Sequence, residues 1–296
     1  MTTARKVAAF VVSLLAVFAV AVWVGKASGP RVEVEVAHAD GHAQGHDAAP
    51  VAPELPGGLQ STQGGYTLDL TKPVTVAAAK APLHFRIVDA QGAPVTRYTE
   101  NHEKLLHLVV VRNDLSRFQH VHPILHTDGT WSVSTDLSRA GDYRVFADFI
   151  PAGGPALTLG TNLHVAGQYN PQPLPAQAPS AEVDGYTVAL RGTPKTGESS
   201  LLTLSVSRDG RPVTDLQPYL GAYGHLVALR AADLAYLHVH PAGEPGDGKT
   251  PSGPDIGFHT TFPSAGDYRL YLDFQHGDVV RTAEFTVTVG EPGHGH

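Results

Sequence analysis

The chain has 296 residues, of which 17 are histidine and none is cysteine, and its formal net charge is −7. The lack of cysteine excludes disulfides, thiolate nucleophiles, iron–sulfur clusters and blue-copper centres, because each of these needs a thiolate. The negative charge argues against nucleic acid as a partner, since phosphate binding needs a basic surface.

The N-terminus carries an uncharged apolar run of 18 residues, from Val7 to Val24, directly after Arg5 and Lys6. This run reaches the lower limit for a helix that spans a bilayer, and it is long for the core of a signal peptide. We therefore predict a signal anchor at residues 1–25, with a single pass through the cell membrane and an extracytoplasmic body. Cleavage near Ala27, which would give a secreted protein, is the alternative.

Two stretches rich in small residues and proline predict connectors without a packed core. Residues 26–62 predict a disordered tether that also contains histidines, and residues 168–182 predict a proline-rich linker. The tether precedes the first predicted domain, residues 63–167, and the linker separates it from the second, residues 183–290. A short histidine-rich tail follows at residues 291–296.

The two predicted domains are copies of one sequence. A shift of 118 residues aligns Gly92–Pro123 with Gly210–Pro241 without a gap, and 12 of the 32 aligned positions are identical. The motif AGDYR recurs at Ala140 and Ala265 with a shift of 125 residues. The sequence therefore indicates an internal duplication.

Each copy contains about seven short apolar–polar alternations separated by turn residues, and no amphipathic helix lies between them. The motif AGDYR resembles the turn and tyrosine that lead into strand F of immunoglobulin-like domains. In that corner, the hydroxyls of Tyr143 and Tyr268 would bond to backbone upstream. We predict an all-β fold with two tandem immunoglobulin-like β-sandwich domains behind one N-terminal transmembrane helix.

The motif FQHVHP places His120 and His122 two residues apart, so both side chains leave one face of a strand. If Asn113–Ser116 forms a hairpin turn, His107 lies opposite His122 and diagonal to His120. Three imidazoles on one face suit Cu(II) or Zn(II). The second copy repeats the three histidines in the same order, as His225, His238 and His240.

Asp148 and Asp273 occupy matching places in strand F, as candidate fourth ligands or as carboxylates that orient a histidine. The competing interpretation is that the histidines are structural. The duplication favours metal, because all three histidines of a copy are among its identical positions, whereas His102 aligns with Leu220. With an ordinary pKa of about 6.5, protons would compete with the ion below about pH 6.

At HVHP and AGDYR the chain resembles bacterial envelope proteins of the CopC type and proteins with YtkA-like domains. The resemblance implies a copper-handling binding protein, with His120, His122, His238 and His240 as the matching residues. In CopC-type proteins, copper is held by histidine and aspartate and often by an amino-terminal histidine. This chain has no such terminal histidine, so that part of the site does not transfer.

The sequence thus predicts a membrane-anchored, extracytoplasmic binding protein for a divalent transition metal, with copper preferred over zinc, that buffers or donates metal without catalysis. The alternative is a cell-surface module that binds a protein or polymer and uses its histidines structurally. Nucleotide is not expected as a partner. The segment GEPGDGKT fits a phosphate-binding loop, but Pro251 and Pro254 prevent the helix that this chemistry needs. The protein partner and the oligomeric state stay open.

Overall fold

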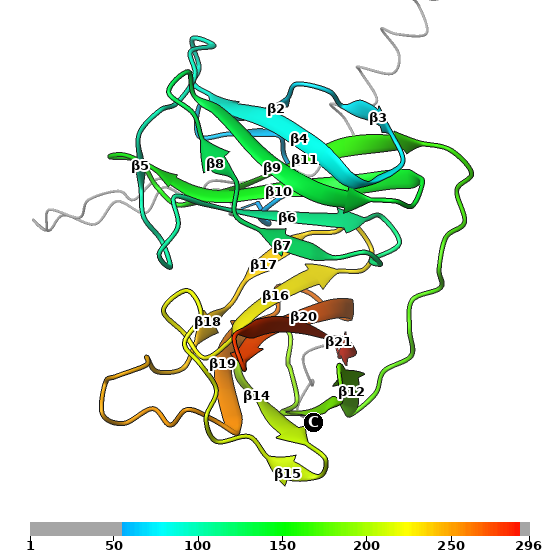
Figure 1. The fold of residues 1–296 in the computed structure, drawn as a ribbon, viewed down its shortest axis with the longest axis vertical. Coiled ribbons are helices and arrows are strands. Elements are labelled where there is room, and N and C mark those ends of the chain that lie inside the picture. The colour runs from blue at the N-terminus through cyan, green and yellow to red at the C-terminus, as the bar shows by residue number, and fades with distance from the viewer. Residues whose placement is uncertain (1–54, 291–296) are drawn as a thin grey trace, which may run out of the picture. The chain divides into compact units, whose positions relative to one another are not determined.

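The computed structural model describes residues 55–290, apart from the side chains of His238 and His240 (Figure 1). The predicted membrane segment, the tether up to residue 54 and the histidine-rich tail lie outside the described residues. Strands, turns and loops make up residues 55–290. No helix in this range has the length and apolar character that a membrane span needs. The predicted all-β fold is confirmed for the described residues.

Repeat 1 contains two sheets. The first has the strand order β1-β2-β4-β9-β8, and the second has the order β3-β11-β10-β6-β7, with β5 paired to β10 (Figure 1). The strands are β1 (Thr62–Gln63), β2 (Tyr66–Leu70), β3 (Val74–Val76), β4 (Ala78–Val88), β5 (Tyr98–Thr99), β6 (Leu106–Arg112), β7 (Gln119–Val121), β8 (Ile124–Leu125), β9 (Thr130–Leu137), β10 (Gly141–Pro151) and β11 (Leu157–Ala166).

Repeat 2 follows the same plan. Its sheets have the orders β12-β13-β14-β19-β18, with β15 paired to β14, and β17-β16-β20-β21. The strands are β12 (Ser180–Val183), β13 (Tyr186–Arg191), β14 (Ser199–Arg208), β15 (Arg211–Pro212), β16 (His225–Arg230), β17 (Tyr236–His238), β18 (His240–Pro241), β19 (Asp255–Thr261), β20 (Gly266–His276) and β21 (Val279–Val289).

The tyrosine corner predicted from AGDYR is present in both repeats. The Tyr143 hydroxyl donates to the Arg139 carbonyl at 2.8 Å, and the Tyr268 hydroxyl donates to the Ser264 carbonyl at 3.0 Å. Both tyrosine rings are buried. In each repeat, this bond fixes the turn that leads into the long strand β10 or β20, as it does in immunoglobulin-like sandwiches.

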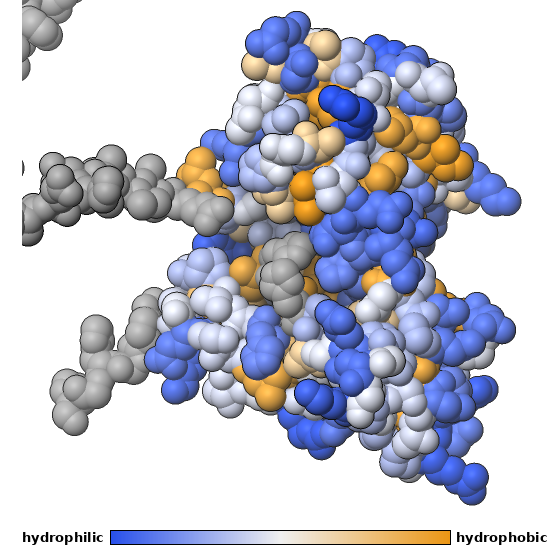
Figure 2. Space-filling view, turned by 90° about the vertical axis from the view of Figure 1, so that its left-hand side faces the viewer, coloured by the Kyte–Doolittle hydropathy of each residue, from blue (hydrophilic) through white to orange (hydrophobic). Residues whose placement is uncertain are grey.

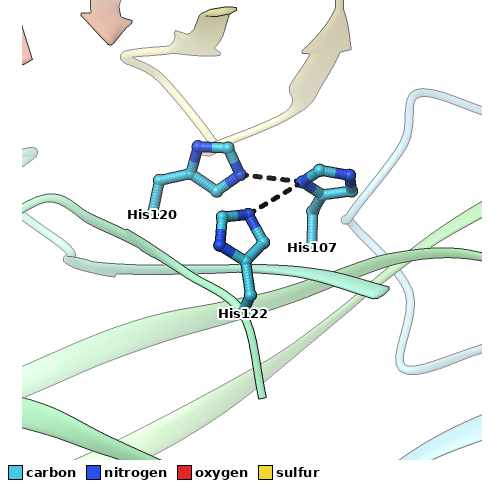
Figure 3. A group of neighbouring side chains, drawn as sticks. All are labelled: His107, His120 and His122. Atoms are coloured by element: carbon cyan, nitrogen blue, oxygen red, sulfur yellow. Dashed lines mark hydrogen bonds between the residues drawn. The ribbon is translucent and has the colours of Figure 1, made fainter. Parts of the chain in front are cut away.

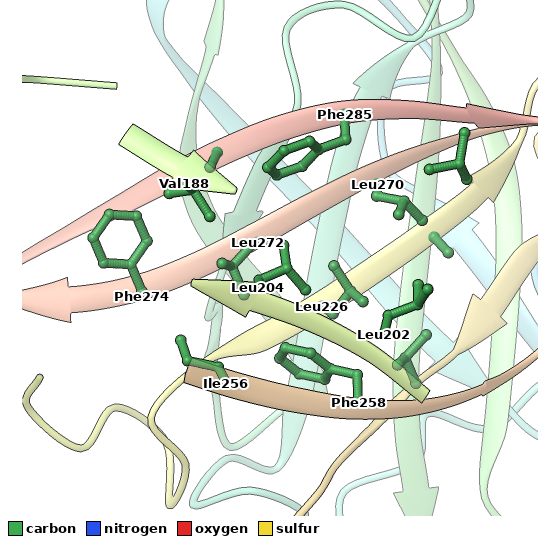
Figure 4. Packing of buried hydrophobic residues seen from close by; sticks show 14 of the residues in the cluster. Val188, Leu202, Leu204, Leu226, Ile256, Phe258, Leu270, Leu272, Phe274 and Phe285 are labelled. Atoms are coloured by element: carbon green, nitrogen blue, oxygen red, sulfur yellow. The ribbon is translucent and has the colours of Figure 1, made fainter. Parts of the chain in front are cut away.

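Each sandwich has its own hydrophobic core, formed by the inward side chains of its two sheets. In repeat 2, leucine and phenylalanine side chains from β14, β16, β19, β20 and β21 interdigitate between the sheets (Figure 4). Alternation along each strand sends one set of side chains into this core and the other set to the opposite face of the sheet. Burial of the first set supplies the main driving force for folding.

A third buried cluster joins the two repeats, and it holds the outer face of β6 and β10 against that of β16 and β20. Val109 and Val111 of β6 meet Val227 and Leu229 of β16 in this cluster, together with Tyr271 of β20. The strands β6 and β16 are therefore covered on both faces. This explains why HLVVVR and HLVALR are continuous apolar runs rather than alternating ones.

The segment before β1 is part of the packed structure from residue 55 onward, although the sequence predicts a disordered tether up to residue 62. Tyr236 pairs with Gly57 in an isolated β-bridge, and the Arg144 guanidinium donates to the carbonyls of Gly58, at 2.6 and 3.2 Å, and Leu59, at 2.8 Å. Small residues let this segment lie close to both repeats, because a Cβ added at Gly58 would meet the Phe146 ring at 2.4 Å. The tether is thus ordered where it reaches the domains.

Candidate metal centre

The hairpin of β6 and β7 brings the three predicted histidines of repeat 1 together. Val109 pairs with His120 across the two strands, which is the register that the sequence predicts. This register places the His120 side chain on the face that carries His107 and Val109. His122 follows β7 directly and returns to the same side. The site is thus built by two short strands and the residue after the second.

The imidazole nitrogens of this triad converge on one point (Figure 3). The Nδ1 atom of His107 lies 3.1 Å from Nε2 of His120 and 3.2 Å from Nε2 of His122. The ring centroids are 4.9–5.3 Å apart. His107 is 6% exposed, and the side chain of His120 is also 6% exposed. The three rings therefore form a compact cluster that is largely removed from solvent.

The partners of the outer ring nitrogens decide which nitrogens carry protons. The Nε2 atom of His107 donates to the carbonyl of Asn101 at 2.9 Å, so the Nδ1 atom of the neutral ring carries a lone pair. The Nδ1 atom of His120 faces the Asp273 carboxylate at 2.8 Å and donates to it, so Nε2 of the neutral ring carries a lone pair too. When both rings are neutral, two lone pairs meet at 3.1 Å. A cation at this point would remove their repulsion.

The spacing of these nitrogens fits a shared ion. Imidazole nitrogens bind Zn(II) at about 2.0–2.1 Å, and two such ligands at a tetrahedral angle lie about 3.3 Å apart. The observed separations of 3.1 and 3.2 Å are close to that value. Three histidines would leave one position of a four-coordinate ion to water or to another donor.

Asp273 belongs to repeat 2, yet it bonds to a histidine of repeat 1. Its Oδ2 atom accepts from His120, and its Oδ1 atom accepts from the Thr282 hydroxyl at 2.6 Å. The sequence prediction placed Asp273 with the histidines of its own repeat. The structure differs because the outer faces of β6 and β20 pack together, which carries Asp273 across to His120. A carboxylate in this place fixes the tautomer and the orientation of a metal-binding histidine.

Burial lowers the pKa of two histidines in the cluster, His107 and His122. The pKa of His107 falls to about 4 and that of His122 to about 3, in both cases chiefly through loss of hydration. The neighbouring imidazoles lower both values further, because two positive rings would repel each other. The rings of His107 and His122 are therefore neutral at physiological pH, which is the form that binds metal.

In repeat 2, His225 lies in the same local setting as His107. Its Nε2 atom donates to the Tyr219 carbonyl at 2.8 Å, and burial lowers its pKa to about 4. The predicted ligands His238 and His240 have side chains outside the described part of the structure. Their backbone is described, and it has the predicted register at His238, opposite Val227. His240 instead pairs with His259 of β19, in the other sheet.

Asp148, the counterpart of Asp273 in repeat 1, is 8% exposed and lies opposite His107 on β10. Its Oδ1 atom accepts from the Thr158 hydroxyl at 3.4 Å. It lines a small cavity of about 30 Å³ that also borders His107, His120 and His225. The structure thus brings Asp148 next to the triad and to the repeat-2 histidine.

The sequence prediction missed His102. Its ring centroid lies 6.2 Å from that of His107 and 5.4 Å from that of His225. The aligned residue of repeat 2 is Leu220, so the criterion of repetition between the copies excluded it. The available signal was the sequence distance to His107, which is only five residues.

The chain is similar to several solved structures at low identity. The Escherichia coli adhesin FdeC is 17% identical over 78% of this chain and 65% of that chain, with a TM-score of 0.26. A putative membrane anchored protein from Corynebacterium diphtheriae is 12% identical over 78% of this chain and 60% of that chain, with a TM-score of 0.23. Invasin, a bacterial integrin-binding protein, is 13% identical over 74% of this chain and 39% of that chain, with a TM-score of 0.21.

The chain spans less than two thirds of each of these three proteins. No curated protein matches the sequence. A family model described as a domain of unknown function (DUF8832) matches residues 60–169 and 181–291, which are the two repeats. The chain therefore belongs to the DUF8832 family, whose domain it carries in two copies.

Proposed function

We propose that this protein binds a divalent transition metal at His107, His120 and His122, and that it holds or donates this metal outside the cytoplasm without catalysis. The observation that carries the proposal is the convergence of three imidazoles, in which the Nδ1 atom of His107 lies 3.1 Å from Nε2 of His120 and 3.2 Å from Nε2 of His122. The bond from His120 to Asp273 supports it, because ligating histidines usually donate their second nitrogen to a carboxylate or carbonyl.

Copper is the preferred ion. Imidazole nitrogens suit both Cu(II) and Zn(II), and at a given site the affinity for Cu(II) exceeds that for Zn(II). The chain has no cysteine, and its single methionine is Met1, so thioether and thiolate ligands that would select Cu(I) are lacking. The donor set therefore favours Cu(II), with Zn(II) second. The extracytoplasmic location rests on the predicted signal anchor at residues 1–25.

A competition titration tests the proposal. The full chain is titrated with Cu(II) or Zn(II) against a chromophoric chelator, in a background in which the five histidines of the tether and tail are replaced by glutamine. These are His38, His42, His46, His294 and His296. The parent should bind an ion tightly, and His107→Ala should weaken the tightest site by about two to three orders of magnitude, since one of three ligands is lost.

His164→Ala is the matched control. His164 also bonds to an aspartate, Asp142, at 2.6 Å, but its side chain is 51% exposed and lies outside the cluster. This variant should keep the affinity of the parent. Equal affinity in the parent and in His107→Ala would refute the proposed site.

The alternative function is a cell-surface interaction module in which the histidines hold the repeats together. The bond from His120 to Asp273 would serve that role without an ion. The face drawn in Figure 2 adds no support to it. On the face seen in Figure 2, hydrophobic residues form small separate areas among hydrophilic ones, as is ordinary for a soluble surface.

The two functions differ in their linkage to metal. A metal-binding protein gains stability as the free ion concentration rises above its dissociation constant. An interaction module with structural histidines shows no such gain, and its alanine variants unfold more easily with or without metal. Calorimetric unfolding at several metal concentrations distinguishes the two.

A further inference from the structure

His225 is prepared for an ion in the same way as His107. Its Nε2 atom donates to the Tyr219 carbonyl at 2.8 Å, as His107 donates to Asn101, so the Nδ1 atom of the neutral ring carries the lone pair. The residue opposite His225 on β20 is Asp273, just as Asp148 lies opposite His107 on β10. His107 and His225 are therefore equivalent in the two repeats both in position and in the orientation of the ring.

His225 also lies close to the triad, because the outer faces of the two repeats pack together. Its ring centroid is 6.4 Å from that of His120. The cavity of about 30 Å³ borders His225, His120, His107 and Asp148, and it has room for an ion or a water molecule. His107 and His120 of repeat 1 and His225 of repeat 2 thus line one small space.

His102 adds an imidazole between the two repeats. It occupies a tight turn in which Asn101 and Lys104 exchange backbone hydrogen bonds, and the φ angles of His102 and Glu103 are 48° and 61°. Left-handed angles are costly for residues other than glycine. The ring of His102 faces that of His225 edge-on at 5.4 Å.

Repeat 2 forms the same turn with different residues. Tyr219 and Ala222 exchange the backbone bonds there, and the two left-handed residues are Leu220 and Gly221. Leu220 is buried, and Gly221 adopts a positive φ at little cost. Repeat 1 thus keeps the turn although it lacks the glycine, and it carries an imidazole where repeat 2 carries an apolar side chain.

Two buried carboxylates flank the cluster. Asp273 bonds to His120 and so lies beside the triad. Asp148 is 8% exposed and lines the cavity that His225 and His102 also line. Because a buried cation needs a nearby negative charge, two carboxylates are available to the cluster: Asp148, opposite His107, and Asp273, opposite His225.

We propose that His225 and His102 hold a second Cu(II) or Zn(II) ion beside the first, with Asp148 as its carboxylate, so that the two repeats share one paired metal centre. This inference rests on the proposed function, since the first ion occupies the triad. The ligands named here all have side chains that the structure describes, unlike His238 and His240.

Electron paramagnetic resonance of the Cu(II)-loaded full chain, again with glutamine in place of the tether and tail histidines, tests the proposal. One equivalent of Cu(II) should give the signal of an isolated ion. A second equivalent should bind and produce dipolar broadening and a half-field transition, because two Cu(II) ions this close interact magnetically.

Two variants and a control complete the experiment. His225→Ala should abolish the half-field transition and reduce the number of tightly bound ions from two to one. His102→Leu introduces the residue that repeat 2 has at this position. It should weaken the binding of the second ion by about tenfold or more while the fold is kept. His126→Ala, which removes an exposed histidine bonded to Ser132, should change neither the number of ions nor the spectrum.

Two bound ions without magnetic interaction would overturn the shared centre, and so would a second ion that survives His225→Ala. A single ion that is lost with His107→Ala, with no second ion in the parent, would overturn this inference and leave the proposed function standing. A chain that binds no ion tightly would overturn both.

Discussion

Replacing Asp273 by asparagine removes the negative charge from the bond that orients His120. The Oδ2 atom of Asp273 lies 2.8 Å from Nδ1 of His120, and the two side chains are 5% and 6% exposed. The carboxamide oxygen of the new side chain can still accept from His120, and the Thr282 hydroxyl, which now bonds to Asp273, can rotate to accept from the amide nitrogen. The shape of the site is thus kept while the charge is lost.

The loss of charge should weaken metal binding by about tenfold to a hundredfold, as for other carboxylates that orient a metal-binding histidine. This range corresponds to about 1.4–2.7 kcal/mol of binding free energy. A charge-assisted hydrogen bond contributes about 1.5–3 kcal/mol, against about 1 kcal/mol for a neutral one, so the lost charge accounts for about 0.5–2 kcal/mol, which overlaps the lower part of this range. A competition titration with a chromophoric chelator measures the change, and Asp273→Ala should have the larger effect.

Asp142→Asn is the control, because Asp142 forms a similar bond to His164 at the surface, where its side chain is 60% exposed. Its effect on metal affinity should be undetectable. If Asp273→Asn binds Cu(II) and Zn(II) as tightly as the parent, the carboxylate of repeat 2 does not support the site, and the reasoning from the bond to His120 is wrong.

Three further predictions concern stability. Burial lowers the pKa of His107 to about 4 against about 6.5 in the unfolded chain, so the unfolded state binds a proton that the folded state excludes. Urea unfolding of the metal-free protein should therefore show stability falling as the pH drops from about 6.5 to 4, by up to about 3 kcal/mol from this residue, and a flat profile there would contradict the burial argument. Tyr271→Phe should cost about 1 kcal/mol, because its hydroxyl donates to the Leu115 carbonyl of the other repeat at 2.6 Å; an unchanged unfolding midpoint would show that this bond does not hold the repeats together. Tyr143→Phe should cost a similar amount through loss of the corner bond to Arg139, measured in the same assay, and no loss would remove the corner as a stabilising feature.

The pH range of metal binding differs from the one that the sequence alone predicts. An ordinary histidine pKa of about 6.5 implies competition from protons below about pH 6. Burial of His107 and His122 lowers their pKa values to about 4 and about 3, so protons compete with the ion only at lower pH. Burial depends on the packing of repeat 2 over β6, which no local pattern in the sequence indicates.

The sequence predicted the features that depend on local pattern or on comparison of the two copies. Alternation and turn residues predicted the sandwiches, and AGDYR predicted the hydroxyl bonds of Tyr143 and Tyr268. The spacing of FQHVHP and the position of the turn predicted the register that pairs Val109 with His120. These features need only the period of a strand and the length of a loop.

The features that the sequence did not predict depend on how the repeats pack. The run HLVVVR indicates a strand that is covered on both faces, but it does not say what covers the second face. The contact of Asp273 with His120 spans 153 residues, and it arises from that packing. His102 was set aside because repeat 2 has Leu220 at the aligned position. A centre shared by the two repeats, as proposed above, would need this histidine in only one of them.

X-ray absorption at the copper edge is the most direct test of the central claim, that the three histidines bind a metal ion together. With one equivalent of Cu(II), the account predicts a shell of about three imidazole nitrogens near 2.0 Å and the multiple scattering that imidazole rings produce. In His122→Ala the shell should lose one imidazole, whereas His164→Ala should leave it intact. A shell with no more than one imidazole, or one that His122→Ala leaves unchanged, would contradict the account.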